Sequence, residues 1–362
     1  MKRKRASGGK TPPKHGKYMS HIEARTCRLS ERILVEYLAA TGGTSRQPKQ
    51  VSPDDVIIGG ALTARQKRRV KGLVTQKYKQ VFMQSPDDIP PALPSVSPIK
   101  WKLQADAKPV RCRKPNWGPA QEAWLKDWTL RALKAGLITR ADGSEWSSRP
   151  VLVPKYRGDT PKGAVPDDIR LCIDYVAVNE LIQKLVDQYP DPHPLLRKAA
   201  GHKLYFVADA QKQFNSFRLE EGQTQEMTAF WTPLGLMKFT RLIMGAKNSS
   251  TIAQAIYTRF MTTYLPAETQ AAMVNFQDDF VGFENDGDKL VDHFENFLEM
   301  CNNTGVKLNP AKFKVGVTEA KFYGYRLTSK GMHPAEVNLD PIRKLVAPTN
   351  RKELRSLLGL FV

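Results

Sequence analysis

Two adjacent carboxylates set between apolar runs are the feature that most restricts the fold of this 362-residue chain. In the segment "MVNFQDDFVGF" (273–283), the apolar residues on both sides of Asp278 and Asp279 predict the two strands of a β-hairpin. Aspartate is common in hairpin turns, so this segment alone is compatible with a plain turn. Whether the two acids do more depends on the rest of the chain.

A second acidic strand end precedes the hairpin. In "YFVADAQKQFNSF" (205–217), Asp209 ends an apolar run that is expected to be buried in the sheet. If that strand lies beside the hairpin, Asp209 and Asp278 converge at one edge. Buried carboxylates repel each other unless a cation or a proton lies between them. Together with a basic chain, the pair suggests phosphoryl transfer on nucleic acid, in which two Mg²⁺ ions roughly 3.5–4 Å apart clamp the reacting oxygens.

The net charge of +20 favours a polyanionic partner, either nucleic acid or an acidic membrane surface. No run of about 20 apolar residues exists, so no membrane-spanning segment is expected. The start "MKRKRASGGK" lacks the apolar core of a secretory signal; its basic run fits a nuclear address, a nucleic-acid contact or, in preference, a solvated tail. The scattered cysteines argue against structural zinc and suit a reducing intracellular compartment; they are Cys27, Cys112, Cys172 and Cys301.

The pattern of elements predicts an α+β fold, with helices segregated from a largely antiparallel sheet. Helices are expected over 62–82, 118–136, 249–265, 288–305 and 350–360, and one in 32–40. Strands are expected over 151–155, 169–175, 203–210, 227–233, 236–243, 313–317 and 321–327, besides the hairpin. Trp124 and Trp128, one helical turn apart, fit a base-stacking platform or, more commonly, core packing.

Several motifs follow one another in the order found in reverse transcriptases of Gypsy-type LTR retroelements, and the chain resembles these enzymes over about 62–362. The motifs are "LKAGLITRADGSEWSSRPVLVPK", "RLCIDYVAVNELI", "VADAQKQF", "MTAFWTPLGLMKFTRLIMGAKNSSTIAQ", "FQDD", "GVKLNPAKFK" and "FYGYRLTSKGM". Each is weak alone, but the ordered set is specific. Composition predicts a basic, flexible arm at 1–61 and a helix with a Pro-rich linker at 62–99. The resemblance implies right-hand polymerase fingers and palm at 100–335 and the start of a truncated thumb or connection at 336–362. It also implies a cytoplasmic or particle location, with the nucleus as an alternative.

The resemblance assigns roles at the reaction centre. Asp209, Asp278 and Asp279 match the catalytic carboxylates, and the Ala210 carbonyl is a further candidate ligand for Mg²⁺, or for Mn²⁺ in its place. Lys312 matches a candidate general acid that would protonate pyrophosphate. The alternative for Lys312 is a lysine on a solvated strand.

Other roles concern the substrates, which the resemblance implies are dNTPs and an RNA or DNA template with its primer. Phe214 would clash with a 2′-hydroxyl and so select deoxynucleotides, with core packing as the alternative. Gln277 would lie against the primer end or the nucleotide, and Lys155 and Arg170 would grip the triphosphate, although Arg157 and Lys162 compete with Lys155 for that position. The remaining candidates are Gly245 and Asn248 beneath the template–nucleotide pair, Gln254 on the same helix or on its surface, and Phe322, Tyr323, Gly324 and Tyr325 at the primer.

Three departures from the family pattern stand near these positions: Val176 replaces a basic residue, "NSSTIA" replaces "NAPATF", and "KQFNS" replaces "SGYHQ". They leave a catalytically inactive nucleic-acid-binding remnant as the alternative to an active polymerase. An RNA-templated RNA polymerase would use the same palm, but Phe214 argues against it. The sequence does not indicate an oligomeric state.

Overall fold

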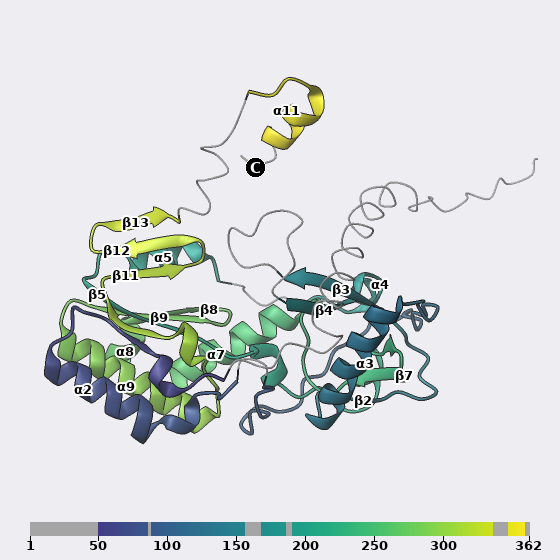
Figure 1. The fold of residues 1–362 in the computed structure, drawn as a ribbon, viewed down its shortest axis with the longest axis horizontal. Coiled ribbons are helices and arrows are strands. Elements are labelled where there is room, and N and C mark those ends of the chain that lie inside the picture. The colour runs from purple at the N-terminus through teal and green to yellow at the C-terminus, as the bar shows by residue number, and fades with distance from the viewer. Residues whose placement is uncertain (1–49, 86–87, 156–167, 186–189, 336–346, 359–362) are drawn as a thin grey trace, which may run out of the picture.

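The computed structural model describes residues 50–85, 88–155, 168–185, 190–335 and 347–358. Except for 347–358, they form two lobes (Figure 1): a palm lobe, at the left, built on the largest sheet, and a fingers lobe, at the right, built on smaller sheets. Antiparallel sheets backed by helices confirm the expected α+β class. No described helix is both long and apolar enough to cross a bilayer.

The palm sheet has five strands in the order β1-β10-β5-β9-β8. They are β1 (Ile57–Ile58), β5 (Leu204–Asp209), β8 (Met273–Phe276), β9 (Asp279–Glu284) and β10 (Lys314–Val317). All neighbours pair antiparallel except β1, which runs parallel to β10. The two acidic segments of the sequence therefore lie on neighbouring central strands, β5 and β9.

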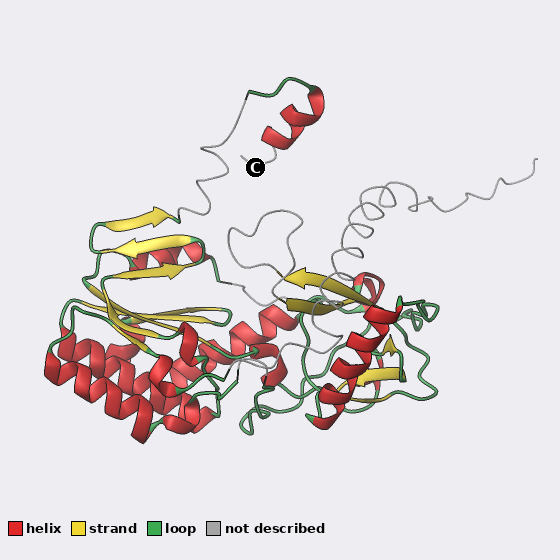
Figure 2. Cartoon of the chain, viewed as in Figure 1, coloured by secondary structure: helices red, strands yellow, loops and turns green. Residues whose placement is uncertain are grey.

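Helices cover one face of this sheet and a second sheet covers the other (Figure 2). The helices are α2 (Ala64–Gly72), α7 (Ser249–Tyr264), α8 (Ala267–Ala271) and α9 (Gly287–Thr304). The second sheet consists of β11 (Glu319–Phe322), β12 (Tyr325–Thr328) and β13 (Gly331–Pro334), with α5 (Pro192–Ala199) beside it. Alternate residues of β5 serve the two layers: the Phe206 ring lies 5.6 Å from that of Phe297 in α9, whereas Tyr205 packs in the cluster that contains Leu327.

The fingers lobe holds β2 (Ile138–Arg140), β6 (Phe230–Thr232) and β7 (Gly235–Phe239) in one sheet and β3 (Arg149–Lys155) and β4 (Asp168–Asp174) in another. Its helices are α3 (Pro119–Lys134), α4 (Val176–Leu181) and α6 (Gln223–Glu226). Trp124 is 3% exposed, and the Trp128 ring lies 6.2 Å from the Phe230 ring. Both tryptophans are therefore core residues, and the base-stacking interpretation is wrong.

The long elements lie where the sequence predicts them, including α9, whose apolar face is buried and whose C-cap is Gly305 at φ 84°.

The arm boundary at 61 is wrong, because Ile57 and Gly59 donate backbone hydrogen bonds to Phe313 and Val315 and add β1 to the palm sheet. Strands β1, β2 and β13 and helices α4, α5, α6 and α8 were not predicted. The final helix is α11 (Arg351–Leu358). The expected helix in 32–40 lies outside the described residues.

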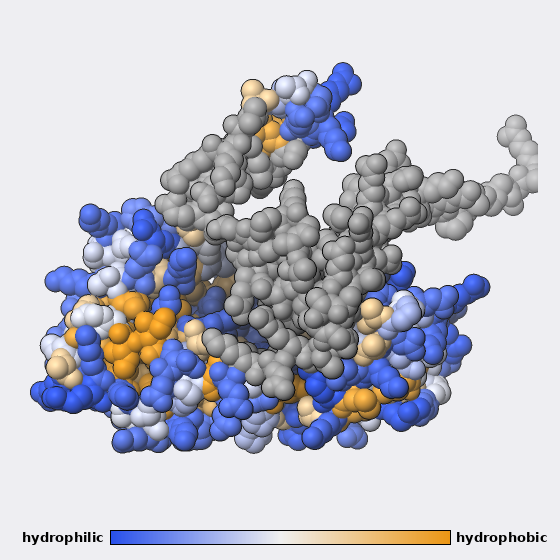
Figure 3. All heavy atoms as spheres, in the orientation of Figure 1, coloured by the Kyte–Doolittle hydropathy of each residue, from blue (hydrophilic) through white to orange (hydrophobic). Residues whose placement is uncertain are grey.

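Short turns of helix complete the described chain: η1 (Pro53–Asp55), η2 (Leu73–Lys77), η3 (Lys79–Val81), η4 (Gln213–Ser216) and η5 (Pro310–Lys312). Hydrophilic side chains cover most of the face seen in Figure 3, between smaller apolar areas.

Gly282→Ala should destabilise the palm, because a Cβ there would lie 2.0 Å from Cε1 of Phe206 on the neighbouring strand. We expect the free energy of unfolding to fall by about 1–3 kcal/mol, as for other overpacked cores, measured by urea denaturation. Gly60→Ala is the control, since no heavy atom lies within 4 Å of its added Cβ. Equal midpoints for the two variants would contradict this packing.

Candidate active site

Two carboxylates face each other across the centre of the palm sheet. Asp209 is the last residue of β5, Asp279 is the first residue of β9, and the two are direct partners in the antiparallel register. Side chains of directly opposite residues share one face of a sheet, and like charges in that position destabilise it. Asp209 is only 8% exposed, so water screens this repulsion weakly. The fold thus holds two acids together at a cost in stability.

Asp278 joins them from the hairpin turn. Phe276 pairs with Asp279, so Gln277 and Asp278 form a two-residue turn and Asp279 already belongs to the strand. The backbone amide of Ala210, directly after Asp209, donates to the Asp278 carbonyl at 2.8 Å. The structure therefore brings together the three acids that the sequence singles out, with Ala210 beside them.

The charges perturb one another. Burial raises the pKa of Asp279 to about 6, and the charges of Asp278 and then Asp209 add to the effect. Burial also raises the pKa of Asp209, with Lys312 opposing the rise and Asp278 contributing to it. The group favours either a proton or a cation.

One cation is already present. The Lys312 ammonium lies 2.8 Å from Oδ2 of Asp209. Partial burial lowers the pKa of Lys312, but the three carboxylates, Asp209 foremost, outweigh it and raise that pKa. Lys312 lies in the short helix η5 and not on a strand, and its side chain is 60% exposed, so its role as a general acid stays a prediction.

A buried amide network holds the hairpin turn. Gln277 has φ 57°, a left-handed conformation that is strained for a side chain with a Cβ. Its backbone amide donates to Oε1 of Gln254 at 2.7 Å, and Nδ2 of Asn275 donates to its carbonyl at 2.8 Å. Gln254 also donates to Oδ1 of Asn275 at 2.8 Å.

The network corrects one expectation and adds a residue. Gln254 is 4% exposed, so it has no helix-surface role and instead fixes the backbone of the turn. Asn275 was not singled out in the sequence, although a polar residue inside the apolar run "MVNF" was a usable signal.

Gln213 links the segment of Phe214 to Gln277. Phe214 belongs to η4 and is partly buried against the main core. The adjacent Gln213 is 4% exposed, and its Nε2 donates to Oε1 of Gln277 at 3.4 Å. The fold thus connects the segment expected to contact the nucleotide sugar with the acidic hairpin.

The loop before α7 is held from α4. The Nδ2 of Asn179 donates to the Gly245 carbonyl, and its Oδ1 accepts from the Lys247 amide, both at 2.8 Å. Gly245 has φ 90° and is exposed. Asn248 is the residue that precedes the first turn of α7.

The fingers candidates lie further from the acids. Arg170 is exposed on β4 opposite Val153, and no contact joins it to the carboxylates in the part of the chain that is described. Lys155 ends β3, but its side chain, like Arg157 and Lys162, falls outside the described residues.

The primer candidates form the turn between β11 and β12. Tyr323 and Gly324 have φ 45° and 74°, as the favoured two-residue hairpin turn requires. The Tyr323 ring is 48% exposed and lies edge-on to Phe276, with centroids 4.6 Å apart. Phe322 is 1% exposed, so direct contact of its ring with a primer is excluded, whereas Tyr325 is partly exposed.

The acidic group suits a hard divalent cation by its chemistry. Its donors are carboxylate oxygens, the ligands that Mg²⁺ prefers, and their repulsion already attracts the Lys312 ammonium. As placed, no three His, Cys, Asp or Glu side chains of the described ranges converge tightly enough to enclose a metal ion. We conclude that the residue types fit a hard divalent cation. Their positions in this structure are those of a state in which Lys312 is paired with Asp209.

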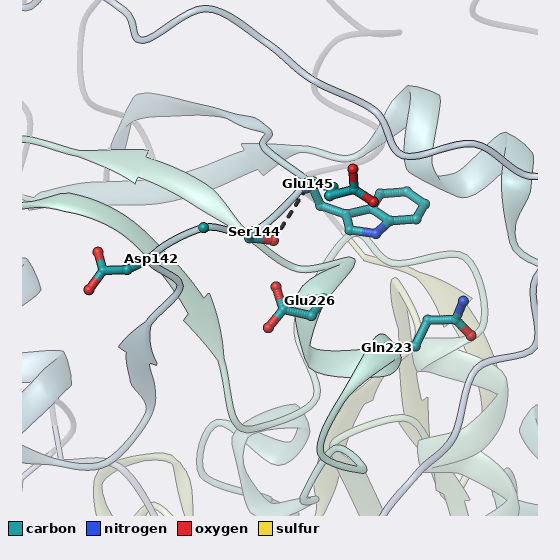
Figure 4. Close-up of a pocket in the computed structure, with 7 residues that line it drawn as sticks. Asp142, Ser144, Glu145, Gln223 and Glu226 are labelled. Atoms are coloured by element: carbon teal, nitrogen blue, oxygen red, sulfur yellow. Dashed lines mark hydrogen bonds between the residues drawn. The ribbon is translucent and has the colours of Figure 1, made fainter.

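A pocket of the fingers lobe is a separate feature. Figure 4 shows it lined by Asp142, Ser144, Glu145, Gln223 and Glu226, with a hydrogen bond drawn from the Trp146 amide to the Ser144 hydroxyl. Its acids are already paired, with Arg140, Arg111 and Lys238. An acidic lining repels phosphates, and none of the catalytic candidates contributes to it, so we place the active site at the palm carboxylates.

A sheet that carries paired carboxylates at the ends of two central strands, backed by helices and joined to a second lobe, is the palm-and-fingers arrangement of right-hand polymerases. Residues 157–327 match the family described as "Reverse transcriptase (RNA-dependent DNA polymerase)". This segment therefore resembles a reverse transcriptase domain.

The similar proteins agree with this. The Tf2-3 and Tf2-7 transposon polyproteins of Schizosaccharomyces pombe are each 26% identical over 242 residues, which is 67% of this chain. The chain spans 17% of the length of these relatives.

Solved structures share the fold. The foamy viral protease-reverse transcriptase in complex with RNA/DNA hybrid has a TM-score of 0.70 at 19% identity, covering 85% of this chain and 38% of that chain. The same protein in complex with dsDNA has a TM-score of 0.70 at 19% identity, covering 92% and 61%. At these identities the likeness establishes the fold.

Gln254→Ala should lower the rate of primer extension by about 10–100-fold, because the strained turn that carries Asp278 loses an acceptor and its neighbour Asn275 loses a donor. The effect should appear in kcat more than in template–primer affinity, and Gln254→Glu, which keeps the acceptor, should recover part of it. Thr262→Ala, exposed on the same helix, is the control. Equal rates for Gln254→Ala and the control would contradict the positioning role.

Asp279→Asn should stabilise the metal-free protein at pH 7.5 but not at pH 4. The folded-state pKa of about 6 exceeds the ordinary 3.8, so the folded state binds more protons between these values. The free energy of unfolding of the parent chain therefore falls as pH rises through that window. We expect the variant to gain about 1–3 kcal/mol at pH 7.5 in EDTA, by urea denaturation. A gain that is independent of pH would contradict the proposed repulsion.

Proposed function

We propose that the chain is an RNA-directed DNA polymerase from a Gypsy-type retrotransposon polyprotein, which extends a primer on an RNA or DNA template with dNTPs. The observation that carries the proposal is the direct opposition of Asp209 and Asp279, with Asp278 in the adjoining turn. The match to the reverse transcriptase family supports the reaction class.

In the proposed reaction, the 3′-hydroxyl of the primer attacks the α-phosphorus of a dNTP and pyrophosphate leaves. Asp209, Asp278 and Asp279, with the Ala210 carbonyl, would hold Mg²⁺, which when bound neutralises the charge that develops on the attacking and leaving oxygens. Mn²⁺ is the alternative ion.

The side chains of the protein do the positioning. The Phe214 ring would exclude a 2′-hydroxyl, and Gln277, tied to Gln213 and to the carbonyl of Ser250, would face the primer end or the base. Lys312 would give a proton to pyrophosphate; its contact with Asp209 supports this role.

The remaining proposed substrate contacts lie in the fingers, at Gly245 and in the primer hairpin. Arg170 and Lys155 would bind the triphosphate from the fingers, and Gly245 would lie beneath the template–nucleotide pair. At the primer, Tyr323 would supply an exposed ring, which contacts Phe276 of the acidic hairpin.

We further propose fingers and palm over 100–335 and the start of a thumb or connection over 336–362. An intracellular site of action, in the cytoplasm or a retroelement particle with the nucleus as an alternative, is supported by the free state of Cys112, Cys172 and Cys301.

Asp278→Asn should lower dNTP incorporation on a primed poly-A template with Mg²⁺ by at least about 10³-fold, because the variant removes a full charge from the acidic group. Template–primer binding should be unchanged. Exposed Glu319 on β11 provides the control variant Glu319→Gln, which changes the charge equally away from the site. Unaltered incorporation by Asp278→Asn would reject the mechanism, and binding without incorporation by the parent chain would favour the inactive alternative.

Phe214→Ala should reduce the preference for dNTPs over rNTPs by about 10–100-fold, since the ring that would meet a 2′-hydroxyl is removed. The measurement is the ratio of kcat/KM for the two substrates in primer extension. An unchanged ratio would assign Phe214 to core packing alone.

A further inference from the structure

Two arginines face each other where the fingers meet the palm. Arg218 follows η4 and Arg241 follows β7, and the two are partners in an isolated antiparallel bridge. The flanking hydrogen bonds run from the Leu219 amide to the Thr240 carbonyl and from the Leu242 amide to the Phe217 carbonyl. This arrangement makes the arginines a non-hydrogen-bonded pair, in which side chains share a face and approach most closely.

The pair has no acidic partner. Among the described residues, no Asp or Glu forms an ion pair with either arginine, and Glu220, the acid nearest in sequence, is paired with Lys100 at 3.1 Å. Partial burial and the charge of Arg218 both lower the pKa of Arg241. Like charges directly opposite each other destabilise a sheet. A bound ligand that is not part of the chain would account for the presence of the pair.

Hydrogen bonds hold Arg241 beside the proposed nucleotide site. Nη1 of Arg241 donates to the carbonyl of Asn215 at 3.3 Å, and Nδ2 of Asn215 donates back to the Leu242 carbonyl at 3.3 Å. Asn215 directly follows Phe214. The guanidinium of Arg241 is therefore aligned one residue from the expected sugar contact.

We propose that Arg218 and Arg241 form a phosphate-binding site, which takes a phosphodiester of the bound nucleic acid or a phosphate of the incoming nucleotide. Guanidinium groups bind phosphate oxygens through paired N–H donors, and two of them about one phosphate would turn the repulsion into shared attraction. The site deepens the proposed polymerase function and rests on it. It is distinct from Lys155 on β3 and Arg170 on β4.

The test compares two double variants of the full chain that change the net charge equally. Arg218→Gln with Arg241→Gln removes the pair, whereas Arg65→Gln with Arg68→Gln removes two exposed arginines of α2, in the helix layer of the palm. Binding of a labelled template–primer is followed against salt concentration in the absence of dNTP. We expect the site variant to lose about 1–2 units of the slope of log K against log salt, at about 0.7–0.9 per lost phosphate contact, and the control to lose little.

A second arm separates the two phosphate sources. If the site holds a nucleic-acid phosphodiester, the slope changes and the KM for dNTP at saturating template–primer does not. If it holds a nucleotide phosphate, the KM rises by about 5–50-fold and the slope is unchanged. Equality of the site variant and the α2 control in both measurements overturns the proposal.

A third readout needs no substrate. Arg218→Gln should raise the midpoint of thermal unfolding by about 1–3 °C at low salt, because the repulsion is removed, and the gain should shrink at 1 M salt. A fall in the midpoint would overturn the claim of repulsion. Absence of incorporation by the parent chain would reject the polymerase proposal, while the slope still decides whether the arginines bind a phosphodiester of the nucleic acid.

Discussion

The repulsion between Asp209 and Asp279 is the constraint on which the rest of the palm depends. The two acids are paired by β-sheet register, so neither can move away without breaking the ladder of β5 and β9. The surroundings compensate: the Lys312 ammonium contacts Asp209, and burial together with neighbouring charge raises the pKa of Asp279 to about 6. The arrangement therefore favours a proton or a cation beside these carboxylates.

The hairpin turn shows how the fold maintains this arrangement. A left-handed Gln277 is unfavourable by itself, but Gln254 from α7 and Asn275 from β8 bond to its backbone from both sides. Since α7 packs under the palm sheet, the position of Asp278 is tied to the helix layer as well as to its own strands. The buried amide side chains of Gln254 and Asn275 thus stabilise the strained turn.

Within the described residues, like charges oppose each other in the palm, as Asp209 and Asp279, and at its junction with the fingers, as Arg218 and Arg241. Both pairs are held by antiparallel backbone hydrogen bonds, and both adjoin η4 or the strand before it. A nucleotide with its metal ions needs groups of both signs, because its phosphates and cations are bound side by side.

The sequence by itself determined the α+β class, the long elements and the three acids, because each is encoded locally by apolar periodicity or by a carboxylate at a strand end. Residues such as Leu290 and Phe294 are buried where the helical period of α9 places them. Only the tertiary structure decided the pairing of Asp209 with Asp279, the burial of Gln254 and Phe322, and the opposition of Arg218 and Arg241. The physical reason is that register and layer packing join segments that are far apart in the chain, and short elements such as β1 form only where a partner strand supplies their hydrogen bonds.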